Sequence, residues 1–423
     1  MKVSKNIQFL RSRLYLLVGI LAAAALILLI LLNRSTIVVQ YSPAGSQILL
    51  DNAPINSAGN GNTKIVTKPG DHILKIQADG YVDQIFNLKL SGGRSKKIEA
   101  NLIEVPKPLL LESGVTKDLS IESITTGDEE NSVFFLGNSG SAIYKVKFKS
   151  DKSAESVYKV TNPGLSGIDS VIWGPKKDAA MFKKGTSAYF FDFQKYNFTS
   201  QQEVKFGDDI GDIAWAPDDS KIAYYYAPAS GEQSLIFADK SNSDIRRVAN
   251  LKDFGIENPY MIWSPSSEWL LLIPRKNDVN SNKVYLFNAY TRTMKTITET
   301  GANLGVSFSP DSNKILFSVS STDPGNPVRS LLSVMNTDGT NIKNLDLRAE
   351  IGKTVWIDNS TILAATFDPE TKGESLFKFN VDAKQKIGFS VPLKQVYVKE
   401  VEISESGNLL YFMANSKLFV LGL

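Results

Sequence analysis

The stretch IAWAPDDSKIAYY, residues 213–225, decides the fold because close relatives of it recur along the chain. In this stretch an apolar strand ends on an aromatic residue, a Pro-Asp turn follows, and a second apolar strand begins at once. The related stretches are VIWGPKKDAAMF (171–182), MIWSPSSEWLLL (261–272) and VSFSPDSNKILF (306–317). Two apolar runs joined by a short turn indicate a β-hairpin, so the chain repeats one hairpin.

The residue before each turn marks the period of this repeat. Successive copies place there Trp173, Trp215, Trp263, Phe308 and Trp356, and three of the turns carry Pro217, Pro265 and Pro310. Ile403 takes the same place in a last copy, so neighbouring copies lie 42 to 48 residues apart. A degenerate first copy, SITTGDEENSVFFL, begins at Ser123. This period is typical of four-stranded propeller blades, and we therefore expect an all-β chain whose residues 103–423 form a seven-bladed β-propeller.

The chain ends after only three strands of the last copy, which predicts how the ring closes. Residues 105–114, VPKPLLLESG, precede the first copy and belong to none of the repeats. We expect them to supply the missing outer strand of the seventh blade, because an open sheet edge exposes unpaired backbone groups. Residues 103–118 would thus form a linker and the closing strand.

Residues 41–102 predict a separate, small β domain. They hold short runs such as QIFNLKL, in which Phe86, Leu88 and Leu90 alternate with polar residues. This alternation is typical of strands with one buried face, and it favours a small β-sandwich.

Both regions resemble known families. SPAGSQILLDN and KPGDHILKIQADGY in the small domain are similar to the PEGA domain family, although residues 43–46 read Pro-Ala-Gly-Ser in place of Pro-Glu-Gly-Ala. The recurring turn resembles the WD40-like repeat of the TolB and prolyl-oligopeptidase propellers. The first resemblance implies a cell-surface module without catalytic residues, and the second implies a fold that serves many functions.

An apolar run predicts a membrane anchor near the N-terminus. The run begins at Leu14, ends at Leu32 and contains no charge; at 1.5 Å per residue its 19 residues would span about 28 Å. Four basic residues precede it and Arg34 follows, so the positive-inside rule places residues 1–13 in the cytoplasm. We expect a signal anchor over residues 14–32, a linker over 33–40 and a single-pass cell-membrane protein with extracytoplasmic domains; a cleaved signal peptide is the alternative.

Charge and composition exclude several functions. The net charge is +3, but five basic residues and no acidic residue precede residue 35, so the remainder carries −2. This balance does not favour nucleic-acid binding, which needs clustered basic residues. There is no cysteine and one histidine, His72, and neither a Gly-x-Ser-x-Gly motif nor a glycine-rich phosphate loop occurs. We therefore expect no cofactor, no metal site and no enzymatic activity.

One acidic stretch is a candidate ligand site. GDDIGD places Asp208, Asp209 and Asp212 just before an inner strand, where they could line a propeller mouth and hold a cation or a basic segment of a partner. An ordinary acidic loop is the alternative. The expected function is a non-catalytic, membrane-anchored scaffold that binds a protein or a cell-wall polymer. Two alternatives stay open, namely a hydrolase or lyase with carboxylates at the channel, and a ligand-sensing subunit of a membrane complex.

Overall fold

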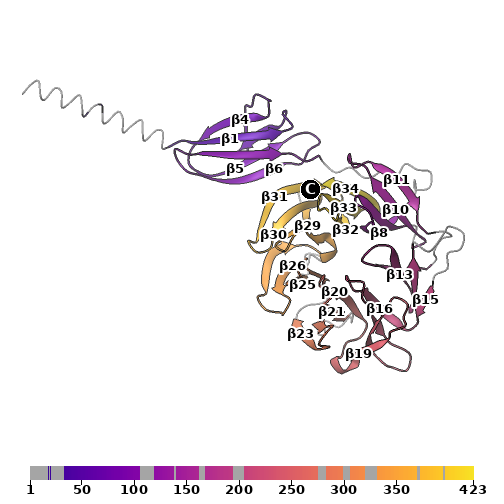
Figure 1. Cartoon of the computed structure of the whole chain (residues 1–423). Coiled ribbons are helices and arrows are strands. Elements are labelled where there is room, and N and C mark those ends of the chain that lie inside the picture. The colour runs from indigo at the N-terminus through magenta and orange to yellow at the C-terminus, as the bar shows by residue number, and fades with distance from the viewer. Residues whose placement is uncertain are drawn as a thin grey trace, which may run out of the picture. The chain divides into compact units, whose positions relative to one another are not determined.

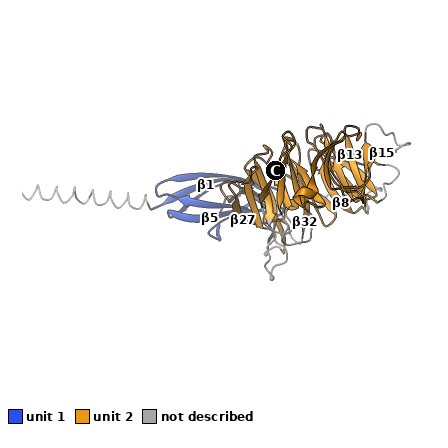
Figure 2. Cartoon of the chain, turned by 90° about the horizontal axis from the view of Figure 1, so that it is seen from below, with its two compact units in different colours: residues 1–105, 388–391 blue, residues 106–387, 392–423 orange. Residues whose placement is uncertain are grey.

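The structure is a computed structural model that describes residues 18, 20, 33–104, 119–137, 140–161, 167–193, 204–274, 283–298, 305–319, 331–368, 372–393 and 396–423. The chain divides into two compact units (Figure 2), residues 1–105 with 388–391 and residues 106–387 with 392–423. Both units are built of β-strands (Figure 1). Two short 3-10 helices, η1 (Leu251–Phe254) and η2 (Ile351–Lys353), lie in the second unit.

The predicted membrane anchor is corrected by the structure. Within the described part of the chain, no helix is long and apolar enough to cross a membrane. The expected transmembrane helix and the single-pass membrane location inferred from it are therefore not supported. Of residues 14–32, only Val18 and Ile20 are among the described residues.

The first unit packs two sheets around one apolar core. One sheet has the order β4-β1-β7 and the other β3-β2-β5-β6. The strands are β1 (Ser35–Ser42), β2 (Gln47–Leu50), β3 (Ala53–Ile55), β4 (Asn62–Thr67), β5 (Gly70–Gln77), β6 (Gln84–Leu90) and β7 (Ser95–Asn101). Leu74 and Ile76 of β5 are fully buried and pack with Leu88 and Leu90 of β6, as the alternation of apolar residues indicates.

The expected linker over residues 33–40 is wrong, because β1 begins at Ser35. This strand lies at the centre of its sheet, antiparallel to β4 and parallel to β7. Ile37 and Val39 are fully buried and Tyr41 nearly so. The alternating run IVVQY, which starts at residue 37, carries this signal in the sequence, but it is short and follows the polar residues 33–36, so the linker interpretation extended over most of it.

The second unit consists of seven sheets, each ordered from its first strand to its last. The first four blades are β8 (Ile121–Thr126), β9 (Ser132–Gly137), β10 (Ala142–Phe148), β11 (Ala154–Lys159); β12 (Ser170–Trp173), β13 (Ala179–Lys184), β14 (Ser187–Asp192), β15 (Val204–Gly207); β16 (Ile210–Trp215), β17 (Ile222–Tyr226), β18 (Ser234–Ala238), β19 (Arg246–Asn250); and β20 (Pro259–Trp263), β21 (Trp269–Pro274), β22 (Val284–Asn288), β23 (Met294–Thr298). The last three are β24 (Gly305–Phe308), β25 (Lys314–Val319), β26 (Leu331–Asn336), β27 (Lys343–Arg348); β28 (Thr354–Trp356), β29 (Thr361–Asp368), β30 (Gly373–Asn380), β31 (Gln385–Leu393); and β32 (Val398–Ile403), β33 (Leu409–Ala414), β34 (Lys417–Gly422). The expected propeller is thus confirmed, and the first strands lie side by side in the pairs β12 and β16, β16 and β20, β28 and β32, and β32 and β8.

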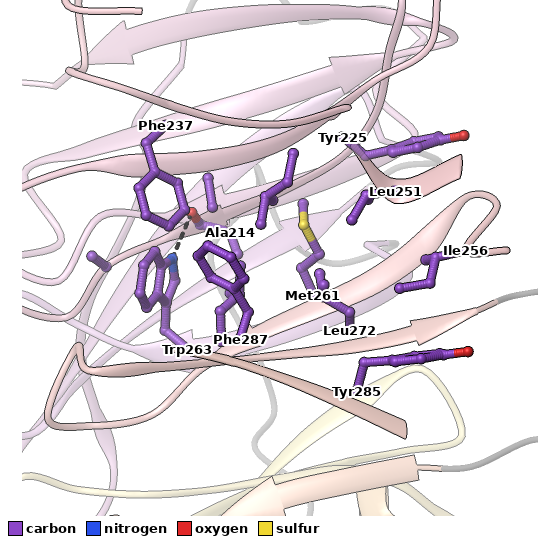
Figure 3. Close-up of a cluster of buried hydrophobic side chains, with 14 residues drawn as sticks. Ala214, Tyr225, Phe237, Leu251, Ile256, Met261, Trp263, Leu272, Tyr285 and Phe287 are labelled. Atoms are coloured by element: carbon purple, nitrogen blue, oxygen red, sulfur yellow. Dashed lines mark hydrogen bonds between the residues drawn. The ribbon is translucent and has the colours of Figure 1, made fainter. Parts of the chain in front are cut away.

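Each blade buries both faces against its neighbours. Between the third and fourth blades, fourteen buried residues form one cluster (Figure 3). Trp263 lies in it, and its indole Nε1 donates a hydrogen bond of 3.0 Å to the carbonyl oxygen of Ala214 in the preceding blade. A blade sheet has two apolar faces, so a blade cannot be stable without neighbours on both sides.

The recurring turn has a fixed backbone geometry. In the third blade the N–H of Asp219 donates to the carbonyl of Ala216, and the N–H of Ala216 donates to the carbonyl of Lys221, both at 3.0 Å. Pro217 follows Ala216, which is the favoured proline position of a β-turn. Asp219 has φ of 60°, and residues with similar positive φ stand at the equivalent place in four other blades: Lys177, Ser267, Ser312 and Gly407. Small or short polar residues are favoured there because positive φ is costly for bulky L residues.

These turns are also bonded to one another around the ring. The N–H of Asp218 in the third blade donates to Ser267 Oγ of the fourth blade at 3.0 Å. The N–H of Ser266 donates in the same way to Ser312 Oγ of the fifth blade at 2.9 Å. The N–H of Asp311 donates to Asn359 Oδ1 of the sixth blade at 3.0 Å. In the fourth and fifth blades the residue at positive φ, Ser267 or Ser312, therefore also holds the turn of the blade before it, and in the sixth blade Asn359 does so.

The seventh blade packs against the first and closes the ring. Tyr411 and Leu418 of the seventh blade share one buried cluster with Phe135 and Phe148 of the first. Glu400 Oε2 of β32 accepts the Ile124 N–H of β8 at 2.9 Å. The seventh sheet comprises β32, β33 and β34 among the described residues. The expected closing strand, residues 105–114, lies outside them and stays a prediction.

We predict that Ser312→Ala destabilises the chain by about 1–2 kcal/mol. The substitution removes the acceptor of the Ser266 N–H, while the β-carbon that serine already holds at positive φ remains. Ser312→Gly removes the same acceptor but also relieves the strain of a β-carbon at positive φ, so it should cost less. Urea unfolding of the three proteins measures the difference, and equal stability of wild type and Ser312→Ala would contradict the role of the bonded turns.

We predict that the fold favours His72 with a proton on both ring nitrogens. Its Nδ1 lies 2.7 Å from Asp51 Oδ2 and its Nε2 lies 2.9 Å from the Lys68 carbonyl oxygen. Both oxygens only accept hydrogen bonds, so both nitrogens must donate. The hydrogen bond with Asp51 raises the pKa of His72 above the ordinary 6.5, and the negative charge of Asp71 adds to the effect.

A raised pKa stabilises the folded state below about pH 6.5, and this stability is lost as the pH rises through the folded pKa. NMR titration is direct because the chain has a single histidine. The ring signals should titrate above 6.5 and shift to lower pH in Asp51→Asn. Titration below 6.5 in the wild type would contradict the assignment.

Candidate functional site

A cleft of about 540 Å³ opens where the turns of the first, second and seventh blades meet. It is lined by residues 126–132, 175–177 and 403–405 and by Tyr411. Each of the three segments is the turn between the first two strands of its blade. Because every blade begins at its first strand, these turns gather on one face of the ring, and the cleft lies on that face.

The first blade supplies most of the cleft because its turn departs from the repeat. Where the third and fourth blades have Pro-Asp-Asp and Pro-Ser-Ser, this turn reads Asp128, Glu129 and Glu130. The residue with positive φ is Asn131, at 57°, one position later than in the other blades, and the N–H of Ser132 donates to the carbonyl of Glu129 at 3.3 Å. The turn therefore keeps its length but not its backbone geometry, while proline is replaced and three consecutive carboxylates are added.

Two of these carboxylates are neutralised by lysines of β10. Lys145 Nζ lies 2.5 Å from Asp128 and 2.6 Å from Glu129, and its side chain is only 4% exposed. Lys147 Nζ contacts Glu129 at 3.1 Å. Burial would lower the pKa of Lys145, but the hydrogen bonds with Asp128 and Glu129 raise it instead. The hydrogen bond with Lys145 in turn lowers the pKa of Glu129.

The second and seventh blades place a lysine and a glutamate within electrostatic reach of each other: Lys177 lines the cleft, and Glu402 precedes the lining segment 403–405. Lys177 Nζ donates to Thr125 Oγ1 at 2.9 Å, and burial lowers the pKa of this lysine against the opposing charge of Glu402. Burial raises the pKa of Glu402 to about 7, although the charge of Lys177 acts against it. Lys176, the neighbour of Lys177, pairs with Asp219 at 3.6 Å.

Tyr411 lines the cleft with a polar atom that has no partner. Its side chain is fully buried, and its hydroxyl makes no hydrogen bond within the described residues. Burial raises the pKa of Tyr411 to about 12, and the negative charge of Glu130 contributes. An unsatisfied buried hydroxyl costs about 1–3 kcal/mol, so this atom requires an explanation.

The structure brings together only two of the three aspartates predicted as a ligand site. Asp208 and Asp209 line a second pocket of about 420 Å³ with Tyr224, Tyr226 and Asn242, among others. Asp208 also pairs with Lys205 at 2.7 Å.

Asp212 lies elsewhere, and its Oδ2 accepts the Met261 N–H of the next blade at 2.9 Å. Asp212 stands three residues before Trp215, as Glu400 stands three before Ile403, and both carboxylates hold the inner strand of the following blade. Within the described residues, no group of three or more His, Asp or Glu could hold a metal ion.

The aromatic residues that precede the recurring turns have structural positions. Trp173, Trp215, Trp263, Phe308 and Trp356 each end the first strand of a blade. Sequence reasoning missed the cleft itself. The signal in the sequence is DEEN, residues 128–131, where the most degenerate copy replaces the proline of the recurring turn with consecutive acids.

No family model matches the sequence, and no curated protein matches it either. A PEGA relationship is therefore not shown. Similar folds do occur among solved structures. A chain of the Kuenenia stuttgartiensis hydrazine synthase matches with 13% identity, covering 74% of this chain and 98% of that one, at a TM-score of 0.52.

An oligogalacturonate lyase in complex with manganese matches with 12% identity, over 72% and 91% of the two chains, at a TM-score of 0.50. A putative TolB from Agrobacterium tumefaciens matches with 13% identity over 63% and 94%, at 0.40. At these identities the first two show the fold alone, and the third is too distant to add to it. The second unit is a β-propeller.

We predict that Glu402 makes the stability of the propeller depend on pH between about 4.5 and 7. Its carboxyl has a raised pKa, so the protonated form stabilises the fold, and this contribution is lost as the pH rises through about 7. Glutamine resembles the protonated form and does not titrate. The melting temperature of Glu402→Gln, relative to wild type, should therefore increase from pH 5 to pH 8.

Glu129→Gln is the matched control from the same cleft. The pKa of Glu129 is lowered, so its contribution is present throughout this range, and its variant should differ from wild type by the same amount at pH 5 and at pH 8. A flat difference for Glu402→Gln would show that its carboxyl does not titrate there.

Proposed function

We propose that this protein is a non-catalytic binding scaffold whose propeller holds a partner protein at the cleft between the seventh, first and second blades. The observation that carries the proposal is the turn of the first blade. Five other blades share a different turn, with the residue at positive φ one position earlier, and none of them has three consecutive acids. A blade of this fold therefore does not need Asp128, Glu129 and Glu130. Departures from a local rule without a structural gain mark functional positions.

The chemistry of the lining favours a protein over a cell-wall polymer as the partner. Sugar rings are commonly bound on exposed aromatic faces, as the apolar side of a sugar needs a flat apolar surface. Among the residues that line the cleft, the one aromatic residue is Tyr411, and its side chain is fully buried. Charged and hydroxyl groups dominate the rest, which suits polar side chains of a polypeptide.

An enzyme is the second candidate, favoured by the Lys177 and Glu402 pair. Perturbed pKa values in a cleft are typical of acid–base catalysis, and burial shifts both groups towards neutrality. Structural ion pairs perturb pKa values in the same way. The two candidates differ in what Glu402→Gln does, since it would abolish turnover of a substrate but leave binding of a partner on the exposed rim nearly intact.

Site-specific photo-crosslinking in the cells that make the protein tests the scaffold proposal. A photoreactive residue is placed at Lys176 or at Ser406, which are exposed at the rim of the cleft, or at Ser230. Ser230 lies between β17 and β18, hence on the opposite face of the ring. One discrete crosslinked protein from both rim positions, absent from Ser230, is the expected result. Equal patterns at all three positions would contradict the proposal.

A further inference from the structure

We propose that the cleft binds a cationic side chain of its partner, an arginine guanidinium in first place, between Glu130, Glu405 and the hydroxyl of Tyr411. The inference rests on the proposed function and adds the chemistry of the ligand. Three independent features of the cleft support it: the balance of its charges, the buried hydroxyl and its dimensions.

The charges of the cleft leave two carboxylates for a ligand. Asp128 and Glu129 are balanced by Lys145 and Lys147. The two lysines of the second blade are engaged as well, Lys176 with Asp219 and Lys177 with Thr125 beside Glu402.

Glu130 and Glu405 are the other charged residues of the lining, and both are exposed. Within the described residues, neither takes part in an ion pair. Because the other charges of the lining are paired, these two carboxylates give the cleft a net negative charge, which attracts a cation.

The hydroxyl of Tyr411 is the second observation that points to a ligand. It is buried, lines the cleft and lacks a partner within the described residues. Glu130 lines the same cleft, and its negative charge acts on this hydroxyl. A guanidinium N–H can donate to this oxygen while the hydroxyl proton points towards a carboxylate, and the buried group is then satisfied.

The cation is a side chain and not a metal ion. A hard metal ion needs several oxygen ligands converging on one point, and no such group of three or more acids is found in the described part of the chain. A volume of about 540 Å³ is that of a site for an extended organic group. The planar fork of arginine can bond two carboxylates at once, whereas the ammonium of lysine acts as a point charge.

Two blocked, fluorescently labelled peptides test the proposal, one with alternating glycine and arginine and one with citrulline in place of each arginine. Citrulline keeps the shape and loses the charge. Fluorescence polarisation with the full chain should show the arginine peptide binding at least about tenfold more tightly than the citrulline peptide. Its affinity should fall as salt is added, because the rim is exposed.

Three variants locate the binding. The double substitution Glu130→Gln with Glu405→Gln should weaken the arginine peptide about tenfold, while Asp208→Asn at the second pocket should leave it unchanged. Tyr411→Phe should weaken it severalfold without lowering the melting temperature, because the hydroxyl has no partner to lose in the fold. If the hydroxyl had only a structural role, Tyr411→Phe would lower the melting temperature and leave peptide binding unchanged.

Equal binding of the two peptides, or equal binding by the double variant and wild type, would overturn the proposal. If that occurs while Lys176 and Ser406 still crosslink one protein in cells, the scaffold proposal stands and only the cation is wrong. If the rim positions crosslink nothing, the scaffold proposal itself fails, whatever the peptides do.

Discussion

The structure depends on one constraint, which is that every blade must be covered on both faces by a neighbour. A blade contributes two apolar faces and cannot bury either alone. The chain meets this constraint by bonding each blade to the next at three levels. Tryptophan rings such as Trp263 fill the interfaces, carboxylates such as Asp212 and Glu400 hold the inner strands, and turn residues such as Ser267 hold the turns.

The candidate site follows from where this ring closes. Glu400 and Ile124 are 276 residues apart in the chain and meet across the seam between the last blade and the first. The first blade has a degenerate turn at this seam, and the cleft that forms there carries its own charges. The buried Lys145 pairs with Asp128 and Glu129. The other carboxylates at the rim of the cleft can therefore interact with a partner.

The sequence predicted the propeller and missed the site for the same physical reason. A turn with proline and a residue at positive φ is a local feature, so Trp215-Ala216-Pro217 and its relatives are visible in one sequence. Contacts across the seam are not local, and nothing in the letters around Tyr411 shows that its hydroxyl lacks a partner. Asp208 and Asp212 are neighbours in sequence, which suggested a common site. In the structure Asp208 lines a pocket, whereas Asp212 accepts a hydrogen bond from the inner strand of the next blade.

Two expectations about the N-terminal region also failed. The apolar run led to a membrane location that the described structure does not support. It also concealed the adjacent strand β1, whose buried residues Ile37 and Val39 form part of the small domain's core. The strand β1 is short and begins only three residues after the long apolar run, so its first part is easily interpreted as a linker that follows the run.

Hydrogen–deuterium exchange of the intact chain tests ring closure most directly. If the seventh blade seals the ring against the first, the amides of β8 and β32 exchange as slowly as those of β16 and β20, since all four strands are held by a following or preceding blade. The Ile124 amide, bonded to Glu400, should then be as protected as the Met261 amide, bonded to Asp212. Fast exchange confined to β8 and β32 would show an open seam, and the cleft built on it would not exist as described.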